Sequence, residues 1–195
     1  MANSRKRVAV LISGRGSNMK SLVEAARAAD YPAEIVLVIS DKPDAKGLDF
    51  ARAEKIPAVA INGKAHDTRQ AHETAIHQTL IEHNIELVCL AGYMRILNEG
   101  FVAKWPGKIL NIHPSLLPKY PGLNTHQRAL DAGDEKHGCT VHIVTGELDA
   151  GPIVAQAEVP VLAGDDAESL TARVLVQEHL LYPKALGIVA GERTP

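Results

Sequence analysis

Lys108-Ile109-Leu110-Asn111-Ile112-His113 leads directly into Pro114-Ser115-Leu116-Leu117-Pro118-Lys119-Tyr120-Pro121-Gly122. The first part has the apolar pattern of a buried strand. The second part holds three prolines, and proline fixes φ, lacks a backbone N–H and pushes the preceding residue to extended backbone. We therefore predict a buried strand that ends at His113 and continues as a stiff loop, a common platform for functional residues.

Two polar side chains interrupt this strand. Asn111 and His113 are two residues apart, so on a strand they project from the same face. An amide beside an imidazole can hydrogen-bond a carbonyl oxygen and move a proton. The alternative is a polar strand end that is satisfied by its own loop, and the spacing by itself leaves both interpretations open.

Before this stretch, apolar runs alternate with helical patterns. We expect strands over residues 7–12, 34–39, 58–61, 86–91 and 108–113, and helices over residues 19–29, 47–55 and 67–84. The inward positions of the third helix are expected to include Ala71, Ala75, Leu80 and Ile81. Alternation of this kind indicates βαβ units with right-handed crossovers and a parallel sheet.

After Gly122 the pattern changes. A short helix is expected over residues 125–131, strands over 138–144 and 152–161, and a terminal helix over 166–189. We predict one α/β domain over residues 1–195, with a Rossmann-like, mostly parallel twisted sheet and helices on both faces. An antiparallel C-terminal strand pair closes the edge of this sheet.

The composition excludes several classes of function. The chain has 195 residues, is 46% hydrophobic and carries a net charge of -2. Its basic residues are spread out, which argues against a nucleic-acid partner. The apolar run after the basic N-terminus is too short for a signal peptide, and no stretch approaches the ~20 residues of a membrane helix. Cys89 and Cys139 have the pattern of reduced core residues, so we predict a cytoplasmic protein.

A glycine turn follows the first predicted strand. Gly14-Arg15-Gly16-Ser17-Asn18 lies between strand and helix, where backbone N–H groups and the helix dipole attract phosphate. Ser17 and Asn18 add donors, and either can cap the helix. A dinucleotide fingerprint needs a third glycine where Met19 stands, so the turn favours a phosphate monoester. A tight strand-to-helix turn with an N-cap is the alternative.

Two further segments are candidates for ligand contacts. Tyr93-Met94-Arg95-Ile96-Leu97 follows the carboxyl end of a predicted parallel strand, and it suits a flat heterocycle with an anionic tail. Ordinary loop packing with a solvated arginine is the alternative. Asp149, in the turn between the two late strands, is either a turn-former or a carboxylate that orients and charges His113.

Nine histidines require a metal site to be considered. His72, Glu73 and His77 resemble part of a zincin motif, but the histidines are five residues apart instead of four. No Cys-x-x-Cys accompanies them. We expect a solvated helix face and no metal.

These stretches together resemble the glycinamide ribonucleotide formyltransferases of purine synthesis. The resemblance runs from Val8-Ala9-Val10-Leu11-Ile12-Ser13-Gly14 to Gln177-Glu178-His179, and it is most specific over residues 111–126. It implies the formyltransferase fold and transfer of a formyl group from 10-formyltetrahydrofolate to the amine of glycinamide ribonucleotide. It further implies small-molecule partners without nucleic acid, membrane or metal, and a monomer or homodimer.

The resemblance assigns roles to individual residues of this chain. The resemblance places the catalytic groups on Asn111, His113 and Asp149. It places the ribonucleotide on Gly16, Ser17, Asn18 and Glu178. It places the folate on Arg69, Met94, Arg95, Ile96, Leu97, Asn111, Thr145, Gly146, Glu147, Leu148 and Asp149. Residues 1–110 then form a phosphate-binding half, and residues 111–195 a catalytic and folate-binding half.

The chain departs from the family in two places. Leu175 stands where relatives often have a polar or basic residue near the phosphate, and the chain stops at Pro195, short of a C-terminal segment that many relatives carry. The implied mechanism is direct attack by the amine. Asn111 and protonated His113 stabilise the developing oxyanion, and His113, held by Asp149, supplies the proton to the leaving nitrogen.

Three rival functions remain at this point. Formyltetrahydrofolate hydrolases use a similar site with water as acceptor, but they usually carry an extra N-terminal domain, and the first strand here begins at Arg7. Methionyl-tRNA formyltransferase needs a basic C-terminal domain. A phosphate- or folate-binding module without chemistry would not need all three of Asn111, His113 and Asp149.

Overall fold

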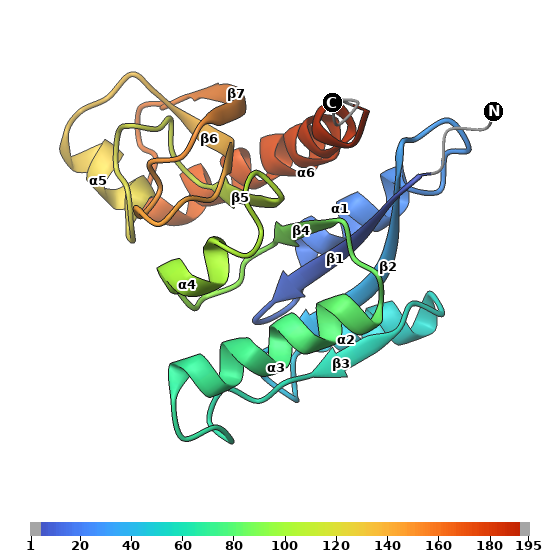
Figure 1. Ribbon diagram of the computed structural model, residues 1–195. Helices are drawn as coiled ribbons and strands as arrows, with labels where there is room; N and C mark the ends of the chain where they lie inside the picture. Colours follow the sequence, from blue (N-terminus) through green and yellow to red (C-terminus); the bar gives the residue numbers. More distant parts are fainter. Residues whose placement is uncertain (1–4, 192–195) are drawn as a thin grey trace.

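The computed structural model describes residues 5–191 (Figure 1). The strands are Lys6–Ile12 (β1), Ala33–Ser40 (β2), Ala58–Ala60 (β3), Leu87–Leu90 (β4), Ile109–His113 (β5), Lys136–Ile143 (β6) and Ile153–Pro160 (β7). The helices are Ser17–Ala25 (α1), Lys46–Ala53 (α2), Arg69–Glu82 (α3), Glu99–Val102 (α4), Thr125–Asp131 (α5) and Ala167–Gly191 (α6). The first residues of the chain and its end at Pro195 lie outside the described range.

All the described strands belong to one sheet, in the order β3-β2-β1-β4-β5-β6-β7. From β3 to β5 every neighbouring pair is parallel, whereas β6 pairs with β5, and β7 with β6, in the antiparallel sense. The predicted fold class is therefore confirmed, including the antiparallel C-terminal strand pair. The central parallel strands β1 and β4 are buried on both faces, and this explains their continuous apolar runs.

Helices cover both faces of the sheet (Figure 1). On one face α1, α2 and α6 bury their apolar side chains, among them Leu22, Leu48 and Leu186, against the strands. On the other face α3, α4 and the segment after α4 do the same, through Leu80, Phe101 and other residues. The helix α6 also packs along α1, β6 and β7. The core thus joins the start of the chain to its last helix.

Three local expectations need correction. The helix α1 ends at Ala25 instead of Ala29, because its buried stripe ends at Ala26 and the next residues are exposed. The helix α4 was not predicted, since four residues show no period, although Asn98 caps it by accepting a hydrogen bond from the Phe101 N–H (2.7 Å). The face of α3 that points into the core also differs from the expected face.

The shift in α3 moves polar residues into the interior. Ala71 and Ile81 are exposed, while His72, Glu73 and Ile76 are buried beside Leu80. His72 is fixed by a 2.8 Å hydrogen bond between its Nε2 and the Ile61 carbonyl oxygen. The expectation of a solvated face at His72 and Glu73 is therefore wrong. A buried polar side chain that hydrogen-bonds a neighbouring loop does not belong to the apolar pattern of the sequence. That pattern therefore could not show that this side chain points inward.

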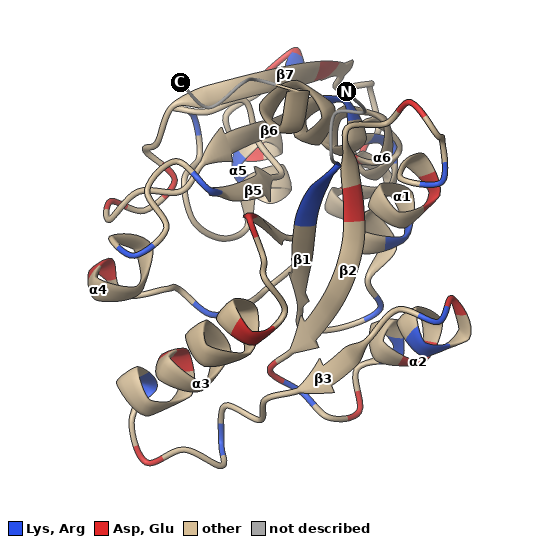
Figure 2. Ribbon diagram, turned by 45° about the vertical axis from the view of Figure 1, so that its right-hand side comes forward, with Lys and Arg blue, Asp and Glu red and all other residues tan. Residues whose placement is uncertain are grey.

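Charges of both signs are interspersed over the surface elements (Figure 2). Within residues 5–191, no helix is long and apolar enough to cross a membrane. Among the same residues, no group of three His, Cys, Asp or Glu side chains is arranged to hold a metal ion.

Tyr182 generates a stability prediction. This fully buried side chain of α6 places its hydroxyl 3.1 Å from the carbonyl oxygens of both Leu90 and Leu110, which belong to the neighbouring strands β4 and β5. Tyr182→Phe keeps the ring but removes the donor, so the free energy of unfolding should fall by about 1–3 kcal/mol. Urea unfolding measures this change.

Tyr93→Phe is the matched control. The Tyr93 hydroxyl is buried and has no hydrogen-bond partner among the described residues. Its removal should leave the free energy of unfolding unchanged or raise it slightly. Equal losses for Tyr93→Phe and Tyr182→Phe would contradict the role assigned to the Tyr182 hydroxyl.

Candidate active site

The predicted site residues gather at one edge of the sheet. The glycine turn follows β1, the segment Tyr93–Leu97 follows β4, and Asn111 and His113 lie at the end of β5. These strands are parallel, so their carboxyl ends meet at the same edge, where open α/β sheets bind ligands. Ser13 links two of the loops, because its hydroxyl donates to Asp41 Oδ1 (2.6 Å) and accepts from the Met94 N–H (2.9 Å).

Asn111 and His113 share the face predicted for them, and β6 adds a third side chain. In the antiparallel register Asn111 lies opposite His142, and His113 lies opposite Thr140. Asn111 Nδ2 is 3.2 Å from His142 Nε2. His113 and His142 are both buried. The Asn111 amide therefore has two neighbouring imidazoles, those of His113 and His142, instead of one.

Asp149 reaches this cluster from the turn between β6 and β7. Its Oδ2 atom accepts a hydrogen bond from the Gly122 N–H (2.9 Å) and lies 3.5 Å from His113 Nδ1. Its Oδ1 atom lies 3.7 Å from His142 Nε2. Asp149 also has a φ of 52°, a left-handed conformation that Asp tolerates in turns. Asp149 therefore forms part of the turn, and its carboxylate also faces His113.

The other nitrogen of His113 is engaged by the proline-rich loop. His113 Nε2 lies 2.9 Å from the Tyr120 carbonyl oxygen, which can only accept, so this nitrogen carries a proton. The Asp149 carboxylate faces the Nδ1 atom of the same ring. Tyr120 has a φ of 56°, unusual for a bulky residue, which aims its carbonyl at the histidine.

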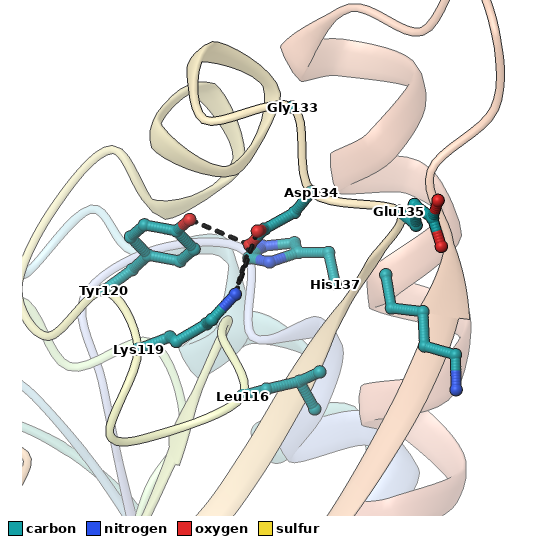
Figure 3. Close-up of a pocket in the computed structure, with 8 residues that line it drawn as sticks. Leu116, Lys119, Tyr120, Gly133, Asp134, Glu135 and His137 are labelled. Atoms are coloured by element: carbon teal, nitrogen blue, oxygen red, sulfur yellow. Dashed lines mark hydrogen bonds and ion pairs between the residues drawn. The ribbon is translucent and has the colours of Figure 1, made fainter.

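The loop that carries Tyr120 is held in place by contacts outside the polar cluster. Beside it lies a cavity of about 430 Å³, and none of the site residues predicted above lines it (Figure 3). The Asp134 carboxylate there accepts from the Tyr120 hydroxyl (2.8 Å) and from Lys119 Nζ (2.9 Å). These contacts hold the Tyr120 backbone in place beside His113.

The glycine turn differs from the prediction in its cap. Gly16 is the N-cap of α1, with φ 70° and ψ 37°, and no side chain caps this helix. The expectation that Ser17 or Asn18 caps it is therefore wrong. The first backbone N–H groups of α1 consequently have no side-chain partner, which is the arrangement that binds phosphate.

Asn18 is used elsewhere. Its Nδ2 atom donates to Glu178 Oε2 at 2.6 Å, so residues 160 positions apart meet where α1 packs on α6. Burial raises the pKa of Glu178, and the Asn18 hydrogen bond and the charge of His113 partly oppose this. Glu178 is therefore close enough to His113 for their charges to interact. Leu175, one turn earlier on α6, is half-buried.

The segment after β4 is held by an ionic network. Arg69 Nε donates to Glu73 Oε1 (3.0 Å), Arg69 also donates to the Ile96 carbonyl, and Glu73 Oε1 accepts from the Asn98 N–H (2.9 Å). The Arg95 guanidinium packs against Gly63. Arg69 and the buried Glu73 thus hold the backbone of this segment in place. The spacing of these two residues in the sequence did not reveal this role.

Apolar side chains in this region divide into two groups. Met94 is 67% exposed, Ile96 62% and Leu148 53%, whereas Leu97 is buried in the core beside Phe101. Gly146, in the turn that carries Leu148, packs against Glu99 of α4, so the two loops are neighbours. Thr145 Oγ1 donates to the Glu147 carbonyl within the same turn (3.3 Å).

Sequence reasoning missed His142 and Tyr120. Strand alternation does place Thr140 and His142 on one face and the buried Cys139 and Val141 on the other. That signal gives no register, so it could not place His142 opposite Asn111. The left-handed Tyr120 has no signal in the sequence.

Known proteins resemble this chain over nearly its whole length. The formyl transferase family matches residues 6–186. Phosphoribosylglycinamide formyltransferase of Escherichia coli strain K12 is 46% identical over 186 residues, which are 95% of this chain and 88% of that protein. The crystal structure of phosphoribosylglycinamide formyltransferase from Brucella melitensis has a TM-score of 0.93 and 54% identity, covering 98% of this chain and 99% of that one.

Larger proteins contain a similar region. Trifunctional purine biosynthetic protein adenosine-3 of Bos taurus is 50% identical over 186 residues, which are 95% of this chain and 18% of that protein. The chain spans 14–18% of the length of the trifunctional relatives it matches from Bos taurus and three insects.

The buried Glu178 generates a prediction for stability against pH. The pKa of Glu178 is raised in the folded protein. The contribution of its carboxyl group to stability is therefore complete below the unfolded-state pKa of about 4.3, and this contribution is lost as pH rises through the folded-state pKa. Glu178→Gln should therefore be as stable as the parent near pH 4 and more stable near pH 8. Urea unfolding at both pH values measures the difference.

Glu34→Gln, at an exposed position of β2, is the control and should match the parent at both pH values. A Glu178→Gln protein that is less stable than the parent near pH 8 would show that the carboxylate stabilises the fold. That result would reverse the sign of the prediction.

Proposed function

The chain belongs to the formyl transferase family, and on that premise we propose that it is a phosphoribosylglycinamide formyltransferase. It transfers the formyl group of 10-formyltetrahydrofolate to the amine of glycinamide ribonucleotide, in the cytoplasm, as a step of de novo purine biosynthesis. One observation supports this most directly. The Asn111, His113 and Asp149 cluster lies beside the buried Asn18–Glu178 pair, so groups suited to acyl transfer adjoin buried polar groups that can bind the amine substrate.

The ribonucleotide is assigned to the α1 side of the site. Its phosphate binds the backbone N–H groups of Gly16, Ser17 and Asn18, since the helix start has no side-chain cap. Glu178 accepts hydrogen bonds from the glycinamide end. The half-buried Leu175 offers the phosphate no charge, so recognition depends on backbone donors and the helix dipole.

The folate is assigned to the two loops on the other side. Exposed Met94, Ile96 and Leu148 give a flat heterocycle apolar contacts. Arg95 and Arg69 face the carboxylate tail, and Leu97 supports the wall from the core. The turn Thr145–Asp149 and Asn111 contact the polar edge of the ring. In this scheme residues 1–110 supply most of the phosphate site, and residues 111–195 the catalytic and folate contacts.

The reaction needs few groups. The amine lone pair attacks the formyl carbon, a C–N bond forms, and the formyl oxygen gains negative charge, which the Asn111 N–H stabilises. The bond from carbon to the folate nitrogen then breaks. The proton that the amine loses ends on that nitrogen, and His113 carries the transfer, with Asp149 holding the charged ring.

His113 must first change one partner. Its Nε2 proton is donated to the Tyr120 carbonyl, and Nδ1 faces Asp149. Catalysis through Nε2 therefore requires the substrate to replace the Tyr120 carbonyl as acceptor. The left-handed Tyr120 backbone makes that carbonyl a strained partner.

A direct assay tests the proposal. The purified chain is incubated with 10-formyltetrahydrofolate, with and without glycinamide ribonucleotide, and both the deformylated folate and the formylated amine are measured. We expect products only when the amine is present. Release of formate in its absence would identify a hydrolase, and binding of either ligand without turnover would identify a binding module.

Asp149→Asn tests the catalytic cluster. The change keeps an acceptor for the Gly122 N–H but removes the charge that faces His113, so kcat should fall by about 10²–10⁴-fold. Since Asp149 acts through His113, the double variant with His113→Ala should be little worse than His113→Ala alone. Fully multiplicative losses would leave Asp149 as a turn-former only. Asp131→Asn, exposed at the end of α5, is the control.

Gly16→Ala tests the phosphate site. A Cβ at Gly16 meets Met19 Cε at 2.8 Å and Gly47 Cα at 3.3 Å, and it disfavours the left-handed φ that aims the first N–H groups of α1. The KM for the ribonucleotide should rise while folate affinity stays. Gly14→Ala is the matched control, because nothing lies within 4 Å of its Cβ. Equal loss of both ligands would count against the phosphate assignment.

A further inference from the structure

The side chain of Asn111 has two chemically different ends. Its nitrogen offers two donors and its oxygen only accepts. A developing oxyanion is stabilised by the nitrogen end and destabilised by the oxygen end. The two ends are almost the same in shape, so packing by itself does not select one. A neighbouring polar group must therefore decide which end faces the reacting carbon.

His142 is the group that meets this amide. It lies opposite Asn111 in the β5–β6 register, with Nε2 3.2 Å from Asn111 Nδ2. Its other nitrogen, Nδ1, lies 3.1 Å from the Ile143 carbonyl oxygen. That oxygen can only accept, so Nδ1 carries a proton. In a neutral ring the Nε2 atom is then a bare lone pair.

The surroundings keep this ring neutral. Burial lowers the pKa of His142, and the positive charge of His113 lowers it further, while the Ile143 carbonyl and Asp149 only partly oppose these effects. The charged or titratable groups that face the ring are His113 and Asp149. At neutral pH, Nε2 therefore accepts a hydrogen bond and does not donate one.

We propose that His142 is a positioning residue, whose Nε2 lone pair accepts one N–H of Asn111 and so fixes the nitrogen end of that amide at the reacting centre. The second N–H of Asn111 is then left for the formyl oxygen. This inference rests on the proposed formyl transfer, and it deepens that proposal by naming what orients its oxyanion donor.

The neutral state of His142 has a second consequence. A charged ring would donate from Nε2 toward Asp149 Oδ1, 3.7 Å away, and would compete with His113 for the same carboxylate. It would also turn the Asn111 oxygen toward Nε2. A neutral His142 therefore leaves the negative charge of Asp149 to His113 and keeps Asn111 as a donor.

Two substitutions separate orientation from packing. His142→Leu fills space without an acceptor, whereas the amide oxygen of His142→Gln can still accept from Asn111. Loss of an oxyanion donor costs about 10²–10³-fold in kcat, so His142→Leu should lose roughly 10- to 100-fold in kcat with both KM values little changed. His142→Gln should recover most of that loss. Equal kcat for the wild type and His142→Leu would overturn the proposal.

A double-mutant cycle tests whether His142 acts through Asn111. His142→Leu should add little to the loss caused by Asn111→Ala, because the group that it orients is already gone. Multiplicative losses, or a Gln variant as poor as the Leu variant, would assign His142 to packing only and overturn the proposal.

A spectroscopic readout is independent of activity. In the ¹⁵N spectrum of the free wild-type protein near pH 7, His142 should show a protonated Nδ1 and an unprotonated Nε2. Protonation at Nε2 would overturn the inference even if every variant folds poorly. Absence of formyl transfer by the wild type, with the expected tautomer present, would refute the proposed function and with it the catalytic meaning of His142. An active wild type with Nε2 protonated would refute only the inference.

Discussion

A buried carboxylate has to be surrounded by donors, and the Asp149 carboxylate meets this requirement with partners from two different segments. Its side chain is only 8% exposed, its Oδ2 atom accepts from the Gly122 N–H, and the same atom faces His113 Nδ1. The penalty for burying an unpaired charge is large, so these segments must lie together for the fold to be stable. The same requirement that joins the proline-rich loop to the turn between β6 and β7 also assembles the polar cluster.

The change of strand direction at β5 explains where the cluster lies. On the side of β1 and β4 the sheet is parallel, and its carboxyl edge collects the loops that suit phosphate and heterocycle binding. On the other side β6 returns antiparallel, so it can place the His142 side chain directly opposite Asn111. A strand parallel to β5 would instead need a long crossover connection, and the polar loop at its carboxyl end would lie at the same edge of the sheet. The site thus uses both types of pairing.

Several groups here are poor choices for stability alone. Burial raises the pKa of Glu178 and lowers that of His142, which means that each is held in surroundings that disfavour its charged form. Their presence beside His113 is typical of active sites, where perturbed pKa values accumulate. The geometry, not the shift, assigns each group a part: Glu178 holds Asn18, and His142 holds Asn111.

The sequence by itself determined the fold class, the order of the main elements and the family, because strand and helix periods and the 111–126 stretch are local patterns. It also placed Asn111, His113 and the glycine turn at strand ends. Only the tertiary structure decided that Gly16 caps α1, that His72 is buried, that the Tyr120 carbonyl engages His113, and that His142 faces Asn111. These depend on register and backbone conformation between distant segments. No local period encodes them, because the free energy that selects them comes from contacts formed only when the chain is folded.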